Sequence, residues 1–511
     1  TAERANLAEM RRLWVHANAV EPRLVEALSR AGTRCFQAWL QAKPENRFDL
    51  FAPALTEVLG LVREVAAAKG AALGVSPYDA LIDQFEPGMR AARVSELFAP
   101  LREEIPGLLD AVIAHQAAHP RPITPAGPFP IESQRQLGLA LMKLLGFDFN
   151  RGRLDVSAHP FCGGAFDDVR ITTRYREDDF VPALMGVAHE TGHALYELNR
   201  PPQWRGLPVG RARGMAVHES QSLFMEMQVS RARPMLGTIA GLVTEHLGSL
   251  NGKPWSGDEL AARCLVVERG LIRVDADEVS YPLHVVLRFE LEQALLGVSD
   301  LPEAWNAGMQ RLLGVTPPDN TRGCMQDVHW TDGSFGYFPS YTLGAMIAAQ
   351  LATAIQRDLS EFHNLLAHGD LSPVRAWLSS HVHQQASLLS TDALVQQATS
   401  ITVLTGAGIS VPGPCSTTSA AATWAEARSA LARRHLGDRV LRLPKTVDVE
   451  PPQILPHQPD GGELGAGENG DRNRQKRKSR HGRTANHVVR EHVGPHQHSQ
   501  ADRGEPQHRG K

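Results

Sequence analysis

Residues 185–200 read MGVAHETGHALYELNR and contain HETGH, in which two histidines stand four residues apart and a glutamate directly follows the first. Residues four apart in an α-helix lie on one face, so His189 and His193 would present both imidazoles to a common point. The flanking segments MGVA and AL are apolar, which predicts a buried helix. A bound cation would satisfy two histidines and a glutamate in such an environment. The alternative is a polar stripe on a surface helix, because five-residue motifs recur by chance.

A catalytic zinc ion takes three protein ligands and leaves its fourth position to water, and HETGH supplies two of the three. Glu190 would lie beside the metal, where its carboxylate accepts a proton from the water. A second helix usually provides the third ligand, and VHESQSLFME (217–226) offers Glu219. His218 would point elsewhere, since successive helical residues diverge by about 100°.

The sequence around this motif predicts a mainly helical fold. From residue 2 to about 115, and again from 181 to about 395, apolar residues recur at intervals of three and four. Between these regions, RLDVSAHPFCGGAFDDVRITTRY (153–175) changes character and ends in an alternating β-branched run. We therefore expect an all-α fold with a short strand at 169–175, just before the HETGH helix.

The composition excludes several classes of protein. The chain has 511 residues, a formal net charge of −3 and five cysteines without a CxxC pair. Neither a disulfide scaffold nor a cysteine-built zinc site fits this pattern, and a cytoplasmic setting does. No segment approaches the roughly 20 apolar residues of a membrane span, and no global positive charge would recruit nucleic acid.

The last hundred or so residues differ from the rest, so we divide the chain into a catalytic domain (1–400) and an atypical, mostly disordered tail (401–511). ITVLTGAGISVPGP (401–414) resembles the opening strand and glycine-rich turn of sirtuin deacylases. The zinc cysteines of that family are absent, and we interpret the stretch as spurious or vestigial, for instance a fusion or reading-frame artefact. The basic run 472–483 could bind nucleic acid nonspecifically, although solvated disorder is the commoner explanation.

Six motifs occur in one order along residues 1 to about 398: HPF (159–161), DVRITT (168–173), HETGH (189–193), HESQ (218–221), IRVDADEVSY (272–281) and GCMQDVHW (323–330). Together they resemble the carboxypeptidase Taq family of HExxH zinc metallocarboxypeptidases. The resemblance implies a saddle-like fold related to angiotensin-converting enzyme and neurolysin, with a deep active-site groove and a commonly dimeric assembly. It also implies a further helical region before Thr1 and removal of C-terminal residues one at a time.

The resemblance assigns the zinc to His189, His193 and Glu219, with Glu190 as the general base, in agreement with the residue spacing. Cobalt is the expected substitute for zinc. Binding the terminal carboxylate of a peptide needs a cation, and arginine has the matching planar fork. The candidates for this cation, which the sequence does not rank, are Arg170, Arg273 and Arg322. His159 of the HPF motif is a further substrate-binding candidate.

Stabilising an oxyanion needs hydrogen-bond donors, and QDVHWTDGSFGYFPSY (326–341) gathers His329, Tyr337 and Tyr341. The alternative is that these aromatic residues only pack. For one of Asp275, Asp277 and Glu278 we predict a role in orienting a zinc-bound imidazole, the alternative being surface charge or helix capping.

The leading hypothesis is a zinc metallocarboxypeptidase that acts on peptides with a free C-terminus, most simply as a cytoplasmic homodimer without membrane or specific nucleic-acid partners. The competing hypothesis is a non-catalytic helical peptide-binding protein with a structural metal or none. A structural zinc would have four protein ligands, whereas a catalytic zinc would have three.

Overall fold

The structure is a computed structural model that describes residues 1–119, 127–157, 159–295, 300–399 and 435. Contacts divide the chain into Thr1–Pro444 and Lys445–Lys511, and all described residues belong to the first unit. The predictions for 401–414, for 472–483 and for disorder in the tail lie outside the described residues. A domain boundary at residue 400 stays a prediction.

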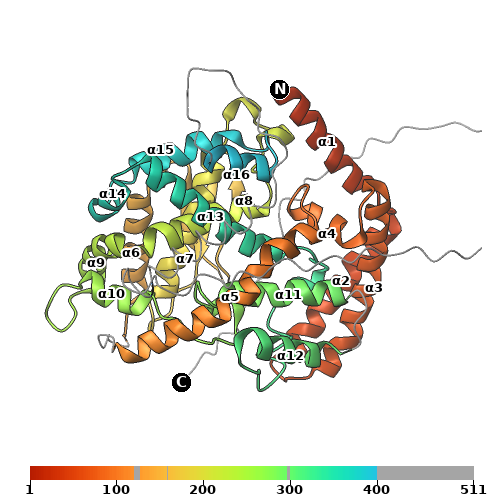
Figure 1. Cartoon of the computed structure of the whole chain (residues 1–511), viewed down its shortest axis with the longest axis horizontal. Helices are drawn as coiled ribbons and strands as arrows, with labels where there is room; N and C mark the ends of the chain where they lie inside the picture. Colours follow the sequence, from red (N-terminus) through yellow and green to blue (C-terminus); the bar gives the residue numbers. More distant parts are fainter. Residues whose placement is uncertain (120–126, 158, 296–299, 400–434, 436–511) are drawn as a thin grey trace, which may run out of the picture. The chain divides into compact units, whose positions relative to one another are not determined.

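The described part of the chain is mainly helical, as predicted (Figure 1). In chain order the helices are α1 (Ala2–Asn18), α2 (Pro22–Ala42), α3 (Phe48–Leu73), α4 (Pro77–Phe85), α5 (Ala91–Ala118), α6 (Ile131–Leu145), α7 (Val181–Leu198), α8 (Met215–Leu223), α9 (Arg233–Leu247), α10 (Gly257–Cys264), α11 (Tyr281–Leu295), α12 (Leu301–Leu313), α13 (Pro339–Asp358), α14 (Phe362–His368), α15 (Ser372–His381) and α16 (Thr391–Thr399). A π-helix, η3 (Phe224–Ser230), continues α8. Short 3₁₀ turns are η1 (Pro202–Trp204), η2 (Pro208–Gly210), η4 (Arg273–Asp275), η5 (His329–Asp332) and η6 (His383–Gln385).

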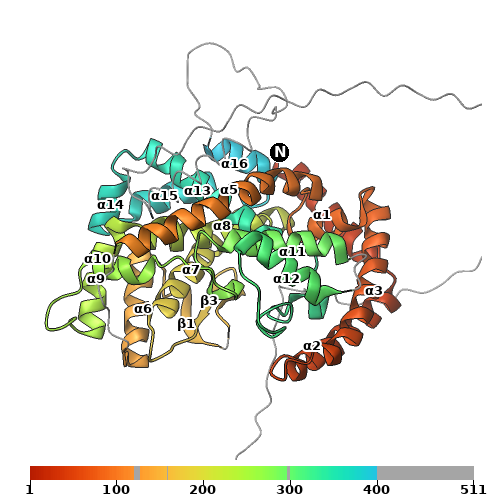
Figure 2. The same ribbon diagram turned by 60° about the horizontal axis from the view of Figure 1, so that its bottom comes forward.

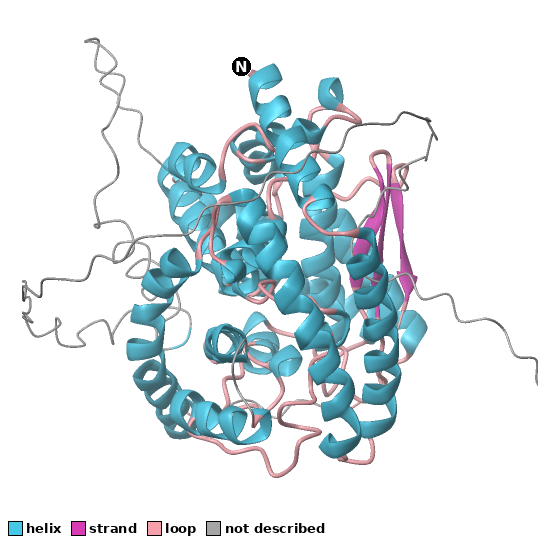
Figure 3. Ribbon diagram, turned by 90° about the vertical axis from the view of Figure 1, so that its right-hand side faces the viewer, coloured by secondary structure: helices cyan, strands magenta, loops and turns pink. Residues whose placement is uncertain are grey.

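A three-stranded sheet precedes α7 and is seen beside the helices in Figure 3. Its strands are β1 (Gly152–Val156), β2 (Phe161–Ala165) and β3 (Asp168–Thr173), in the order β1-β3-β2, with β1 parallel and β2 antiparallel to β3. β3 is the predicted strand. β1 and β2 were not predicted. In β2 the reason is that the glycines and exposed positions of FCGGA lack the alternating pattern of a half-buried strand.

The helix that carries HETGH is buried on two sides, which confirms the prediction of a buried helix. One side of α7 packs on the sheet, where Val187 and Ala194 join Ile171 in a small apolar cluster. Another side contributes Leu184 and Leu195 to the main core. Each fully buried side chain of this size stabilises the fold by about 1.5–3 kcal/mol, so α7 is held firmly between the sheet and the core.

Two glycines allow the helices around the metal motif to approach closely. A Cβ atom on Gly192 of α7 would lie 2.6 Å from Ser222 Cα of α8, and one on Gly344 of α13 would lie 2.7 Å from Glu219 Cβ. Real Cβ atoms do not approach this closely, so a larger residue would force the helices apart. α8 therefore lies between α7 and α13 at a short distance from both (Figure 2).

Among the described residues, no helix combines the length and apolar character that crossing a membrane requires.

Candidate metal centre

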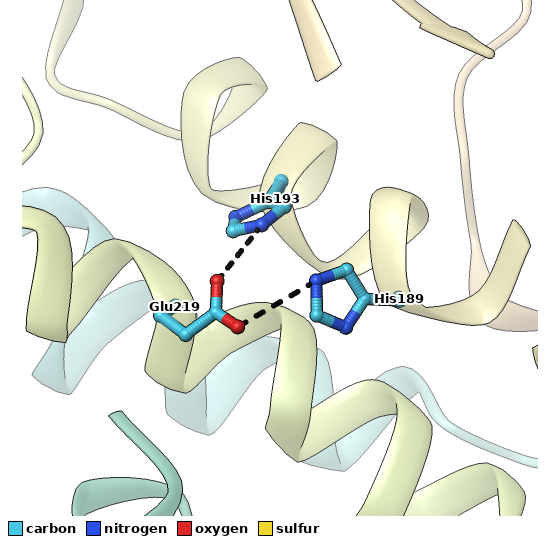
Figure 4. Close-up of side chains that lie close together, drawn as sticks. All are labelled: His189, His193 and Glu219. Carbon is cyan, nitrogen blue, oxygen red and sulfur yellow. Dashed lines mark ion pairs between the residues drawn. The ribbon is translucent and has the colours of Figure 1, made fainter. Parts of the chain in front are cut away.

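His189 and His193 of α7 and Glu219 of α8 come together as predicted (Figure 4). One potential ligand atom from each residue lies within 4.8 Å of the others. The Nε2 atom of His189 is 3.8 Å from Glu219 Oε1, and the Nε2 atom of His193 is 3.4 Å from Glu219 Oε2. Both imidazoles therefore direct the same nitrogen at one carboxylate, which leaves the opposite nitrogen of each ring for other partners.

The outer nitrogen of His189 is held by a carboxylate. His189 Nδ1 lies 3.0 Å from Glu226 Oε2, and Arg231 donates to Glu226 Oε1 through Nε and one terminal nitrogen at 3.1 and 2.9 Å. Glu226 belongs to the π-helix η3, a rare form that is frequently found at functional sites. A carboxylate behind a metal-binding imidazole fixes the ring orientation and makes the ring a better donor.

The prediction that Asp275, Asp277 or Glu278 orients a metal-binding imidazole is wrong in its choice of residue. The carboxylate that fills this role is Glu226. Asp277 instead caps the start of α11, where its side chain accepts hydrogen bonds from the backbone of Val279 and Ser280 at 2.9 and 3.0 Å.

The outer nitrogen of His193 is held by a second histidine. His193 Nδ1 lies 2.6 Å from His218 Nδ1, and His218 Nε2 lies 2.9 Å from Glu197 Oε1. Glu197 in turn forms a 2.5 Å ion pair with Arg200. His218 is outside the group of three metal-binding candidates, as the helical geometry predicted, yet it contacts one of them from behind.

The electrostatics of His189, His193 and Glu219 are those of a cation site. Burial disfavours charge on both imidazoles, but the Glu219, Glu226 and Glu190 carboxylates outweigh it at His189 and raise the pKa of His189 to about 10. At His193 burial prevails and lowers the pKa to about 4. At neutral pH His189 is therefore protonated, and its positive charge lies beside the carboxylates of Glu219, Glu226 and Glu190.

Glu190 lies beside this cluster with a free carboxylate. The residue is only 6% exposed, and no hydrogen bond to its side chain is found among the described residues. Burial raises the pKa of Glu190 to about 7, an effect that the positive charge on His189 partly offsets. A pKa near the working pH suits a group that accepts and returns protons.

His329, Tyr337 and Tyr341 form one cluster near the metal ligands. His329 Nε2 is 3.3 Å from the Tyr341 hydroxyl, and the Tyr337 and Tyr341 rings lie 5.1 Å apart. Burial raises the pKa of both tyrosines, and the charge on Glu219 raises each pKa further. The phenols therefore stay protonated and lie within electrostatic range of the metal cluster.

The structure separates the three candidate arginines. Arg170 and Arg322 are exposed and pair with Asp168 and Asp319, which are two and three residues away. Arg273 is 6% exposed, and its guanidinium stacks 5.1 Å from the centre of the Tyr341 ring.

Arg273 shares one buried carboxylate with a second arginine. Arg273 and Arg288 lie 2.9 and 2.6 Å from opposite oxygens of Asp327, so the three side chains carry one excess positive charge. His159 lies on an exposed loop after β1, where its backbone carbonyl accepts a hydrogen bond from Ser157.

Several residues of the site were not predicted, although two left a signal in the sequence. Glu197 stands four residues after His193 on the same helix face, and Glu226 stands seven residues, or about two turns, after Glu219. Arg231 and Arg200 carry no such signal, because their partners are set by packing.

The residues present fit a metal ion. Three ligand atoms converge, each imidazole has its outer nitrogen engaged, and nearby carboxylates place a proton where a cation would bind. Three protein ligands, rather than the four of a structural zinc, leave room for water. A helix with HExxH, a glutamate ligand from a second helix and a buried glutamate beside them define a metallopeptidase of the HExxH class.

Comparison with known proteins identifies the family. A family profile described as carboxypeptidase Taq (M32) metallopeptidase matches residues 1–406. The chain belongs to this family and is a metallocarboxypeptidase. Thermostable carboxypeptidase 1 of Thermus thermophilus is 40% identical over 408 residues, which cover 77% of this chain and 79% of that protein. Carboxypeptidase 1 of Bacillus subtilis is 40% identical over 351 residues, covering 68% and 69%.

Solved structures agree with the helical fold. Metallocarboxypeptidase 1 of Trypanosoma cruzi matches with a TM-score of 0.78 and 40% identity, covering 85% of this chain and 84% of that chain. An M32 carboxypeptidase from Deinococcus radiodurans matches with a TM-score of 0.74 and 32% identity, covering 85% and 84%.

Proposed function

We propose that this metallocarboxypeptidase binds a zinc ion through His189, His193 and Glu219 and removes C-terminal residues from peptides with a free C-terminus. The observation that carries the proposal is the convergence of these three ligands beside the unbonded, buried carboxylate of Glu190. Two imidazoles and one carboxylate suit zinc, and cobalt is the expected substitute.

Glu190 is the proposed general base. A bound divalent cation supplies Lewis acidity, which lowers the pKa of water from 15.7 towards about 7. The Glu190 carboxylate accepts the proton of the attacking water and passes it to the leaving amine, as its raised pKa of about 7 permits.

Tyr337, Tyr341 and His329 are the proposed donors to the oxyanion. Hydrogen-bond donors fixed before the reaction stabilise charge that develops on the substrate carbonyl oxygen. Support comes from the protonated phenols near Glu219 and from the contact that orders Tyr341 against His329.

Arg273 is the proposed partner of the substrate's terminal carboxylate, and the exposed Arg170 and Arg322 are the less favoured candidates. The support is the excess positive charge of the buried group Arg273, Arg288 and Asp327 beside Tyr341. His159 remains a proposed substrate contact on the resemblance alone.

We further propose a cytoplasmic homodimer, on the family resemblance and on the chain's cysteine usage. The four cysteines within the described ranges, Cys35, Cys162, Cys264 and Cys324, are free thiols, which suits a reducing compartment. Sedimentation at micromolar protein tests the assembly, and a monomer at all concentrations would contradict it.

The test of the function is mass spectrometry of a peptide mixture incubated with metal-stripped protein, with and without added Zn²⁺ or Co²⁺. We expect ladders shortened from the C-terminus only when metal is present. The Glu190→Gln variant should bind the metal as the parent does and lose a factor of about 10²–10⁴ in kcat. Parent-rate release of C-terminal residues by this variant would overturn the mechanism.

A further inference from the structure

We propose that His218 and Glu197 form a positioning relay that fixes the orientation and the tautomer of the metal ligand His193. The inference rests on the proposed metal site and names residues that act on it through His193. The relay runs from His193 Nδ1 to His218 Nδ1 at 2.6 Å and from His218 Nε2 to Glu197 Oε1 at 2.9 Å.

The donor and acceptor roles along the relay follow from the metal end. His193 directs Nε2 at the metal position, so a neutral His193 carries its hydrogen on Nδ1. His218 Nδ1 must then accept this hydrogen, which places the hydrogen of His218 on Nε2. Glu197 Oε1 accepts that hydrogen, and one tautomer of each ring satisfies the whole chain.

The far end of the relay is anchored. The Arg200 guanidinium pairs with Glu197 Oε2 at 2.5 Å, and a second guanidinium nitrogen donates to the backbone carbonyl of Gly210 at 3.2 Å. Because Arg200 presents only donors, it requires an acceptor at Oε2. The orientation of the Glu197 carboxylate is thereby set before a metal binds.

The two imidazole ligands are therefore supported by different chemistry. Behind His189 lies the Glu226 carboxylate, and behind His193 lies the His218 imidazole, with the two rings of this pair 4.6 Å apart at 35°. A carboxylate partner makes a ring a stronger donor than an imidazole partner does. The relay gives His193 a defined tautomer and direction with a smaller gain in basicity.

Glu197→Gln is the decisive variant, because it preserves shape and reverses one hydrogen bond. Arg200 can only donate hydrogen bonds, so it will pair with the carbonyl oxygen of the new amide, and the amide NH₂ will face His218 Nε2. His218 must then carry its hydrogen on Nδ1, where it meets the Nδ1 hydrogen of His193. We expect the affinity for Zn²⁺, measured by competition with a chromophoric chelator, to fall by about 10- to 100-fold.

Two substitutions of His218 separate the hydrogen bond from packing. His218→Asn keeps an acceptor near the position of Nδ1 and should bind Zn²⁺ within a few-fold of the parent, whereas His218→Leu should match the loss of Glu197→Gln. The visible absorption of the Co²⁺ forms should change in the variants that lose affinity. The control is His383→Asn, at a buried histidine that contacts Gln221 of α8 and takes no part in the relay.

Parental Zn²⁺ affinity and Co²⁺ spectra in both Glu197→Gln and His218→Leu would overturn the proposal. If His218→Leu does not fold, the Zn²⁺ affinity and Co²⁺ spectrum of Glu197→Gln alone test the proposal. Peptide release at saturating Zn²⁺ is measured in parallel, so that a protein that binds metal as predicted but cleaves nothing counts against the proposed function and not against the relay.

Discussion

Replacing Arg273 by Met tests how the enzyme selects a free C-terminus. The substitution removes the guanidinium and keeps most of the buried volume of a residue that is 6% exposed. Asp327 stays paired with Arg288 at 2.6 Å, so the variant leaves a neutral pair where the parent has one excess positive charge. The change therefore removes the positive charge proposed to face the substrate carboxylate without stranding a buried anion.

The substitution removes two interactions of Arg273: the proposed ion pair with the substrate carboxylate, which sets the change in kcat/KM, and the ion pair with Asp327, which sets the change in stability. Removing one partner of a buried, hydrogen-bonded charge pair costs about 2–5 kcal/mol. At 1.4 kcal/mol for each factor of ten, kcat/KM for free-acid peptides should fall roughly 30-fold to several thousand-fold. The free energy of unfolding should fall by only about 1.5–3 kcal/mol, the value of a hydrogen bond to a charged group. Asp327→Ala would cost more, about 3–5 kcal/mol, because it leaves two buried arginines side by side.

The assay is a cycle of two enzymes and two substrates. Parent and Arg273→Met are each tested on a peptide with a free C-terminus and on the same peptide amidated. Amidation of the substrate should lower kcat/KM of the parent by about as much as the substitution does, and it should have little further effect on the variant. Arg170→Met and Arg322→Met are the matched controls and should stay within a few-fold of the parent, since both side chains are exposed and locally paired.

Equal cleavage of both peptides by the parent would refute the reasoning, because no carboxylate would then be recognised. A loss in Arg273→Met that is the same for both peptides would also refute it, since the arginine would then be acting on stability or on the oxyanion. A selective loss in Arg170→Met or Arg322→Met would move the role to that residue.

Two other predictions concern the site. Tyr341→Phe should lower kcat about 10²- to 10³-fold with a small change in KM, because a donor to the oxyanion acts in the transition state; an unchanged kcat in steady-state assays would leave Tyr341 a packing residue. Zn²⁺ binding should release at least one proton, because His189 has a pKa of about 10 and is protonated before the metal binds, whereas His193 has a pKa of about 4 and is neutral. Protons compete with the metal for His189, so the logarithm of the Zn²⁺ binding constant should rise with pH between roughly pH 5 and 6.5 with a slope of at least about one, to which Glu190, with its pKa of about 7, adds as the cation favours its ionised form. Calorimetry in buffers of different ionisation enthalpy measures the release, and a value of zero would contradict this assignment.

The residues that share a helix were the easiest to predict from sequence. His189 and His193 are brought together by the helical repeat, and Glu219 follows from the need for a third ligand. Arg273 could not be told apart from Arg170 and Arg322, because its burial depends on Asp327, which lies 54 residues further along the chain.

The carboxylate behind His189 shows a different limit. The prediction chose one of Asp275, Asp277 and Glu278, whereas Glu226 contacts His189 because the π-helix η3 continues α8 past Leu223. Among the strands, β3 was predictable from its alternating β-branched residues. β2 was not predictable, because its glycines carry no strand pattern and it forms a strand by pairing with β3.

The close contact of α7 with α8 bears on how this metal site could be transplanted or diversified. The second variable position of HExxH is Gly192, and a side chain there would meet the backbone of Gln221 and Ser222. On the far side of α8, Gly344 leaves the space that the stem of Glu219 fills. The notation HExxH does not show that Gly192 must be small. We therefore expect a library that randomises Thr191 and Gly192 together to yield functional clones with glycine at position 192. A designer who grafts the three ligands onto another helical scaffold must copy the interhelical spacing along with them.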